Sequence, residues 1–105
     1  MNQSEYKVRF LHAAEDDLGG IVTYIALDNP SAALALADKI EKILSGLSAY
    51  PLLGKVPDEK ALAAMGYRFL VVQNYLVFYT VEGQIIWVHR IIHGARNYLS
   101  LLQEP

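Results

Sequence analysis

The chain has 105 residues, of which 53% are hydrophobic, a formal net charge of −2 and no cysteine. A chain of this length buries one core, so we expect a single domain over residues 1–105. Without cysteine, disulfides, thiol nucleophiles and thiolate metal sites are excluded. No apolar run approaches the roughly 20 residues that span a bilayer, and the start of the chain lacks the pattern of a signal peptide, so we expect a cytoplasmic protein.

Charge is divided unevenly along the chain. Residues 1–53 carry four basic and seven acidic side chains, whereas residues 54–100 carry five basic and three acidic ones. A mildly basic second half is compatible with a partner that presents phosphate or carboxylate groups. The alternative is that the acidic residues only solvate helix surfaces.

The first half of the sequence predicts a strand and two helices. Residues 6–11 alternate apolar and basic, the period of a half-buried strand. From Ala13 to about Leu27 the apolar residues recur at three- and four-residue steps, which predicts a helix. Asn29-Pro30-Ser31 is a start signal for a second helix that runs to about Ala49. Its expected core stripe is Leu36, Ile40, Ile43, Leu44 and Leu47.

Gly19 and Gly20 interrupt the first helix. Each glycine costs about 1 kcal/mol relative to alanine inside a helix. Either the helix is weak at this point or another backbone approaches it closely.

The second half predicts three consecutive antiparallel strands, at residues 67–72, 75–81 and 84–92, after a short helix at 58–65. The polar pairs Gln73-Asn74 and Glu82-Gly83 between the strands are typical of tight hairpins. The sequence therefore predicts a small α+β domain in the order β-α-α-β-β-β. In it a helix hairpin packs on one face of a mainly antiparallel sheet.

Alternation along the strands makes both faces of this sheet apolar. In the last strand the odd-numbered residues from Ile85 to His93 share one face, and the even-numbered residues from Ile86 to Ile92 share the other. A helix hairpin buries only one face, so we expect the other to dock another chain. The alternative is that the 58–65 helix and the C-terminal turn cover it.

After the last strand comes His93-Gly94-Ala95-Arg96-Asn97. The glycine permits a sharp exit, and polar side chains collect at the rim of the sheet. We expect this rim to take part in the function.

The element order, the segment from Asn74 to Tyr79 and the segment Arg90-Ile-Ile-His-Gly-Ala-Arg96 resemble the RelE/ParE superfamily of bacterial toxins. The similarity covers most of the chain, is sharpest from Tyr67 to Tyr98, and is closest to ParE-type plasmid-stabilisation toxins. It implies the toxin component of a type II toxin-antitoxin system, with no cofactor. It also implies a cognate antitoxin whose extended, partly helical tail wraps the toxin.

Members of this superfamily poison different targets. ParE-like toxins inhibit DNA gyrase and are not known for a catalytic site, whereas RelE-like toxins are endonucleases of ribosome-bound messenger RNA. Such cleavage needs cations that stabilise phosphoryl charge. The chain keeps Arg96 but has Tyr67, Phe69 and Leu76 near the positions of RelE cations. These departures favour a ParE-like toxin; the alternatives are a RelE-like endonuclease and a degenerate, non-toxic module that only binds an antitoxin.

For the endonuclease alternative, the expected catalytic residues are Arg68, His93, Arg96 and Tyr98. His93 would act as general acid or base, the two arginines would hold phosphate, and Tyr98 would lie near the scissile bond. Alternatively, His93 only caps a turn and Arg96 interacts with the negative end of a short C-terminal helix.

Residues expected to bind the antitoxin or the target are Arg68, Leu70, Arg90, Ile92 and Arg96. Arg90 has a second interpretation, as the partner of a carboxylate on the first helix. His89, inside a strand, is expected to be a packed and hydrogen-bonded core residue. Metal binding is not expected, because His89 and His93 are the one histidine pair at four-residue spacing and lie about 13 Å apart in a strand.

Overall fold

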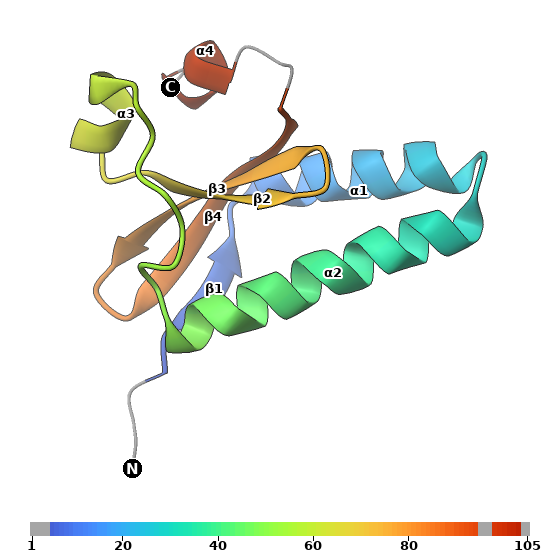
Figure 1. The fold of residues 1–105 in the computed structure, drawn as a ribbon, viewed down its shortest axis with the longest axis horizontal. Helices are drawn as coiled ribbons and strands as arrows, with labels where there is room; N and C mark the ends of the chain where they lie inside the picture. The colour runs from blue at the N-terminus through green and yellow to red at the C-terminus, as the bar shows by residue number, and fades with distance from the viewer. Residues whose placement is uncertain (1–4, 95–97, 104–105) are drawn as a thin grey trace.

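The computed structural model describes residues 5–94 and 98–103 (Figure 1). Its elements follow the predicted order, and the α+β class is confirmed. They are β1 (Lys7–Phe10), α1 (His12–Ala26), α2 (Pro30–Ala49), α3 (Lys60–Ala64), β2 (Arg68–Val72), β3 (Tyr75–Glu82), β4 (Ile85–His93) and α4 (Tyr98–Gln103).

The second helix begins where its start signal lies. The side chain of Asn29 accepts a hydrogen bond from the amide of Ala32 at 3.1 Å, and Pro30 occupies the first turn, where no amide donor is lost. The predicted core stripe is confirmed, with one member, Ile43, only half-buried.

The two glycines of α1 have no neighbour. A Cβ atom built on Gly19 or Gly20 would meet nothing within 4 Å. The expectation that another backbone approaches these glycines closely is therefore wrong, and the glycines only weaken the helix.

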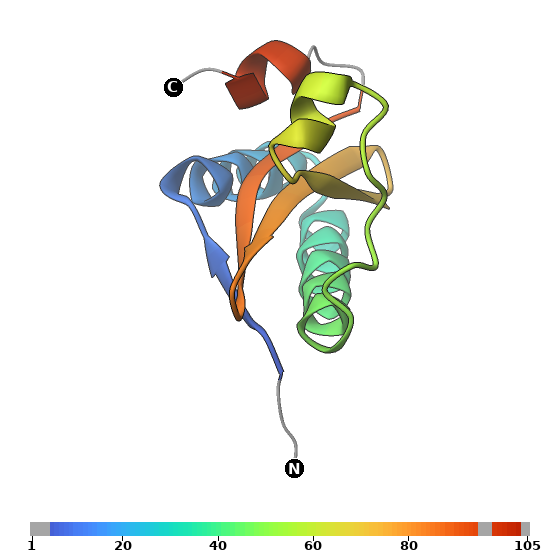
Figure 2. The same cartoon turned by 90° about the vertical axis from the view of Figure 1, so that its left-hand side faces the viewer.

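The four strands form one sheet in the order β1-β4-β3-β2, with β1 parallel to β4 and the other neighbours antiparallel. The α1–α2 hairpin packs on one face (Figure 1; Figure 2). The buried cluster between the hairpin and the sheet comprises Ala14, Leu36, Ile40, Leu44, Leu47, Val72, Val77, Tyr79, Ile86, Val88 and Ile91.

The opposite face of the sheet is largely covered by α3 and α4, which lie together on the side away from α2 (Figure 2), although Val71 of β2 stays exposed. Leu62 of α3 and Leu102 of α4 are buried against Phe78 and Ile92 of the sheet. The expectation that this face is left open for a partner is therefore wrong. Two short helices suffice for this cover, because Leu62 and Leu102 close over the aromatic residues and further apolar side chains of α4 pack beside them: Tyr98, Leu99 and Leu101.

A β-bulge changes which residues of β4 share a face. Phe78 pairs with Arg90 and Tyr79 with Val88, so His89 has no partner on β3. Beyond the bulge the alternation is shifted by one residue. Ile91 therefore joins Val88 in the core under the hairpin, while Ile92 belongs to the opposite cluster. The expected assignment of β4 residues to the two faces is therefore wrong after His89, because it assumes an uninterrupted period of two.

The bulged His89 is held by two hydroxyl groups. Its Nδ1 lies 3.1 Å from the Tyr67 hydroxyl and its Nε2 lies 2.9 Å from Oγ1 of Thr80. A neutral imidazole offers one donor and one acceptor nitrogen, which two hydroxyls can satisfy. Burial lowers the pKa of His89, and the charge of Glu82 opposes this shift. The hydrogen-bonded role expected for His89 is confirmed, although its side chain is only half-buried.

The loop that precedes α3 is anchored on Tyr79. The hydroxyl of this buried tyrosine accepts from the amide of Gly54 and donates to the carbonyl of Pro51, both at 2.8 Å. Burial raises the pKa of Tyr79, although the hydrogen bond from Gly54 and the charge of Arg68 oppose this shift. A Cβ atom on Gly54 would lie 2.7 Å from the hydroxyl oxygen of Tyr79 and 2.8 Å from the carbonyl oxygen of Phe69. Glycine is therefore required at position 54, because these two oxygen atoms leave no room for a side chain.

We expect Gly54→Ala to lower the free energy of unfolding by about 1–3 kcal/mol, because the added methyl group has no room. Gly20→Ala is the matched control. It should raise stability by about 0.5–1 kcal/mol, since the site is open and helical. Urea unfolding of both variants measures the difference, and equal effects would contradict the packing described for Gly54.

The His89 network predicts a pH dependence of stability. Because the pKa of His89 is lowered in the folded state, the unfolded chain takes up this proton first as pH falls below about 6.5. The contribution of a neutral His89 is therefore complete above that pH and is lost on acidification. We expect the stability difference between the wild type and His89→Gln to narrow from pH 7.5 to pH 5 in urea unfolding. A difference that stays constant over this range would contradict the lowered pKa.

Candidate functional site

The structure separates residues that the sequence groups into one catalytic set. Arg68 begins β2 opposite Tyr79 of β3, whereas His93 ends β4 opposite Tyr75. Tyr75 and Tyr79 are four positions apart on β3, which corresponds to roughly 13 Å along the strand. Arg96 lies outside the described residues. In the part of the chain that the structure describes, Arg68 and His93 thus share no phosphate site, and the catalytic set stays a prediction.

Arg68 is engaged with the loop before α3. Its Nη1 donates to the carbonyl of Gly54 at 2.9 Å and to that of Leu52 at 3.3 Å. These bonds hold the loop beside the edge strand β2, where Lys55 and Phe69 also exchange backbone hydrogen bonds of 2.9 and 2.8 Å. The observed role of this arginine is to position the chain.

Tyr98 belongs to α4 and lies on the face of the sheet that α3 and α4 cover. Its ring centroid is 5.1 Å from that of Phe78, and its hydroxyl donates to Oε2 of Glu59 at 2.9 Å. This hydrogen bond, followed by burial, raises the pKa of Tyr98. The contact keeps the phenol protonated and ties α4 to the start of α3.

His93 is exposed at the rim, where β4 ends. Its ring centroid is 5.6 Å from that of Tyr75, nearly perpendicular to it. The next residue, Gly94, donates its amide to the carbonyl of Asn74 at 2.8 Å and so closes the exit from the strand. Tyr75 and Asn74 therefore fix the place of His93 at the rim.

Arg90 forms a two-pronged ion pair with Asp17 of α1. Its Nε and Nη2 donate to the two carboxylate oxygens at 2.7 and 2.9 Å, and the amide of Ile91 donates to the same carboxylate at 2.9 Å. The side chains of Arg90 and Asp17 are only 23% and 15% exposed. The hydrogen bond to Asp17 raises the pKa of Arg90. The interpretation of Arg90 as the partner of a carboxylate on the first helix is confirmed.

The other expected binding residues are also part of the packing. Ile92 is 3% exposed, in the cluster under α3 and α4. Leu70 is half-buried and packs against the core under the hairpin. Binding through Ile92 would require its neighbours to move, whereas Leu70 presents only part of its side chain.

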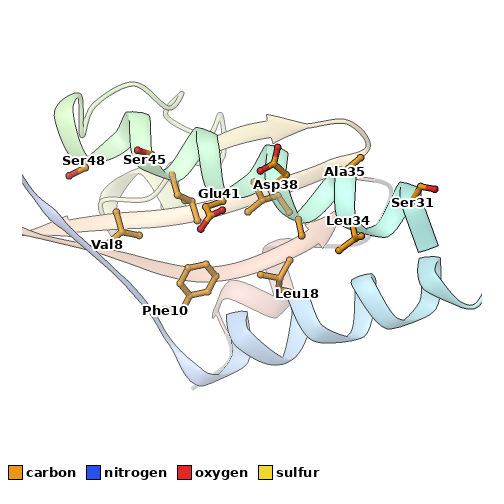
Figure 3. A pocket seen from close by; sticks show the side chains of 13 residues that line it. Val8, Phe10, Leu18, Ser31, Leu34, Ala35, Asp38, Glu41, Ser45 and Ser48 are labelled. Atoms are coloured by element: carbon orange, nitrogen blue, oxygen red, sulfur yellow. The ribbon is translucent and has the colours of Figure 1, made fainter. Parts of the chain in front are cut away.

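A groove of about 1120 Å³ lies between α2, α1 and β1. Figure 3 shows Phe10 of β1, Leu18 of α1 and Leu34 of α2 around it. Leu34 is 72% exposed, although it belongs to this apolar surface. The groove follows from element lengths. A helix of 20 residues is about 30 Å long and extends well past an edge strand of four residues.

The main apolar stripe of α2 does not reveal this groove. A second row with three- and four-residue spacing runs beside that stripe and combines small, apolar and acidic side chains: Ser31, Leu34, Asp38, Glu41, Ser45 and Ser48. Its one large apolar member, Leu34, is the signal that a partner could cover this row.

The described residues contain no group of three histidines or carboxylates placed to hold a metal ion. Nor does any described helix have the length and apolarity that crossing a membrane requires. The polar groups described here position elements, and the open surface is apolar. This arrangement is suited to binding a protein segment.

Comparison with solved structures agrees with the fold. The chain is similar to a structure described as the chromosomal ParDE TA system from P. aeruginosa, with a TM-score of 0.70 and 20% identity over 87% of this chain and 98% of the other. It is also similar to a chain of the toxin-antitoxin complex RelBE2 from Mycobacterium tuberculosis, with a TM-score of 0.59 and 25% identity over 85% and 98% of the two chains.

No curated protein matches the sequence. One family model does match, over residues 8–98, and its description is the ParE toxin of the type II toxin-antitoxin system parDE. The match spans every element from β1 to the start of α4. The chain therefore belongs to the ParE toxin family of type II toxin-antitoxin systems, within the RelE/ParE superfamily.

Proposed function

We propose that this ParE-family toxin stops growth by binding DNA gyrase in the cytoplasm, and that a cognate antitoxin neutralises it by docking in the groove between α2, α1 and β1. The observation that carries the proposal is the family match over residues 8–98. The engagement of the sheet arginines supports binding rather than catalysis. Arg90 is paired with Asp17 and Arg68 with the loop carbonyls, so neither is held ready for a phosphate.

The groove supports the antitoxin part of the proposal. Its apolar lining is drawn from three elements, and Leu34 at its edge is largely exposed. Exposed apolar surface of this kind commonly marks a protein interface. Because both solved relatives come from toxin-antitoxin systems, the natural occupant is a segment of the antitoxin.

A second candidate function, cleavage of ribosome-bound messenger RNA, depends on His93 and on Arg96, which lies outside the described residues. His93 is exposed at the rim and could transfer a proton there. The separation of Arg68 from this rim leaves the described part of such a site with too little positive charge to stabilise a phosphoryl transition state.

Controlled expression in a bacterial host separates the two functions. We expect growth to stop with incorporation of labelled thymidine failing before that of labelled leucine, because a blocked gyrase halts replication first. Cells that express the chain with an early stop codon are the control. If leucine incorporation collapses within minutes while thymidine incorporation continues, the endonuclease function replaces the gyrase proposal. If soluble chain accumulates without any growth defect, both toxic functions fail.

We expect Leu34→Gln to weaken neutralisation while leaving toxicity and folding intact. Burial of a leucine side chain at an interface is worth about 1.5–3 kcal/mol, so its loss should lower antitoxin affinity by roughly tenfold or more. The matched control is Leu27→Gln, since Leu27 is 84% exposed and lies outside the groove. Titration of the purified chain with its co-expressed antitoxin measures the affinity. Equal affinities of the two variants would show that the antitoxin docks elsewhere.

A further inference from the structure

Two carboxylates, those of Asp38 and Glu41, line the apolar groove. They differ in their surroundings. Asp38 has a cation beside it on the same helix, with Nζ of Lys42 at 3.4 Å from its Oδ2. The carboxylate of Glu41 has no hydrogen bond or ion pair within the described residues. Figure 3 shows the side chain of Glu41 projecting from α2 on the side of β1. Glu41 is therefore the unpaired charge of the groove.

No described basic side chain lines this groove. On β1, Lys7 and Arg9 alternate with Val8, which lines the groove, and so point to the other face of the sheet. While the groove is open, water solvates the carboxylate of Glu41. An occupant that covers the apolar lining would remove part of this water, and an unpaired carboxylate would then oppose binding.

We infer that Glu41 selects an antitoxin segment in which a lysine or arginine lies among apolar residues, so that the cation pairs with this carboxylate. The inference rests on the proposed docking of the antitoxin in the groove. The apolar residues of the segment would contact Phe10, Leu18 and Leu34, and the cation would fix its register against α2. A segment with an acidic or apolar residue at this point would leave Glu41 unpaired or repelled, which is a means of rejecting other antitoxins.

Selection from a displayed peptide library tests this inference without a known antitoxin. The library consists of amphipathic peptides of about 16 residues, with apolar residues at helical spacing and all other positions randomised among basic, acidic and neutral residues. The full chain and its variants Glu41→Gln and Glu41→Lys are the targets. Peptides that depend on the groove are recognised by weakened binding to Leu34→Gln.

The control for the charge change is Glu82→Lys. Glu82 is exposed on β3 and lies outside the groove, so this variant changes net charge equally without touching the site. Circular dichroism and the urea midpoint of each variant check folding. Glu41 is exposed on a helix, so its replacement should leave both nearly unchanged.

Peptides selected on the wild type should carry lysine or arginine at one position, and those selected on Glu41→Lys should carry an acidic residue at the same position. For a given wild-type peptide, we expect affinity to fall about three- to fivefold with Glu41→Gln, to fall about tenfold or more with Glu41→Lys, and to stay unchanged with Glu82→Lys.

Two results would overturn the inference, and they can be told apart. Groove-dependent peptides without a charge preference at any position would refute the role of Glu41 and leave antitoxin docking intact. Selected peptides that bind Leu34→Gln as well as the wild type, or the absence of any binder, would refute docking in the groove itself.

Discussion

The arrangement of the molecule depends on the carboxylate of Asp17, which binds Arg90 through two hydrogen bonds and also accepts the amide of Ile91. These contacts join α1 to β4 immediately after the bulge, and so fix the helix hairpin against the sheet. Both charges are partly shielded from water, so losing one partner would leave the other without its ion pair in a part-buried site. Together with the buried apolar stripe of α2, this attachment places the hairpin and the groove beside β1.

The same region decides which surfaces are closed and which are open. The bulge turns Ile91 toward the hairpin and Ile92 toward the other face, where Leu62 and Leu102 close over it. The hairpin thus covers one face of the sheet, and α3 and α4 cover the other in part, since Val71 of β2 stays 60% exposed. The groove along α2 also stays open, and in it apolar side chains meet the carboxylate of Glu41, which has no ion pair among the described residues. A toxin built in this way is suited to recognising other proteins.

Much of the fold could be predicted because its signals are local. Asn29-Pro30 marks the start of α2, and the turns at Gln73 and Gly83 adopt the positive φ angles, 55° and 62°, that tight hairpins use. The bulge could not be predicted, since the carboxylate that stabilises it comes from 73 residues earlier in the chain. The sequence leaves the cover by α3 and α4 open as an alternative, because helices of five and six residues are too short to show a helical period.

The candidate site was the part least accessible from sequence. His93 is exposed at the rim as expected, whereas Arg68 and Arg90, expected to bind a partner, are engaged within the fold. Inhibition of DNA supercoiling by the purified chain tests the central claim most directly, with ribosome-bound messenger in a parallel reaction. The account predicts that supercoiling falls in proportion to added toxin, that antitoxin restores it, and that the messenger stays intact. Cleaved messenger with unaffected supercoiling would contradict it.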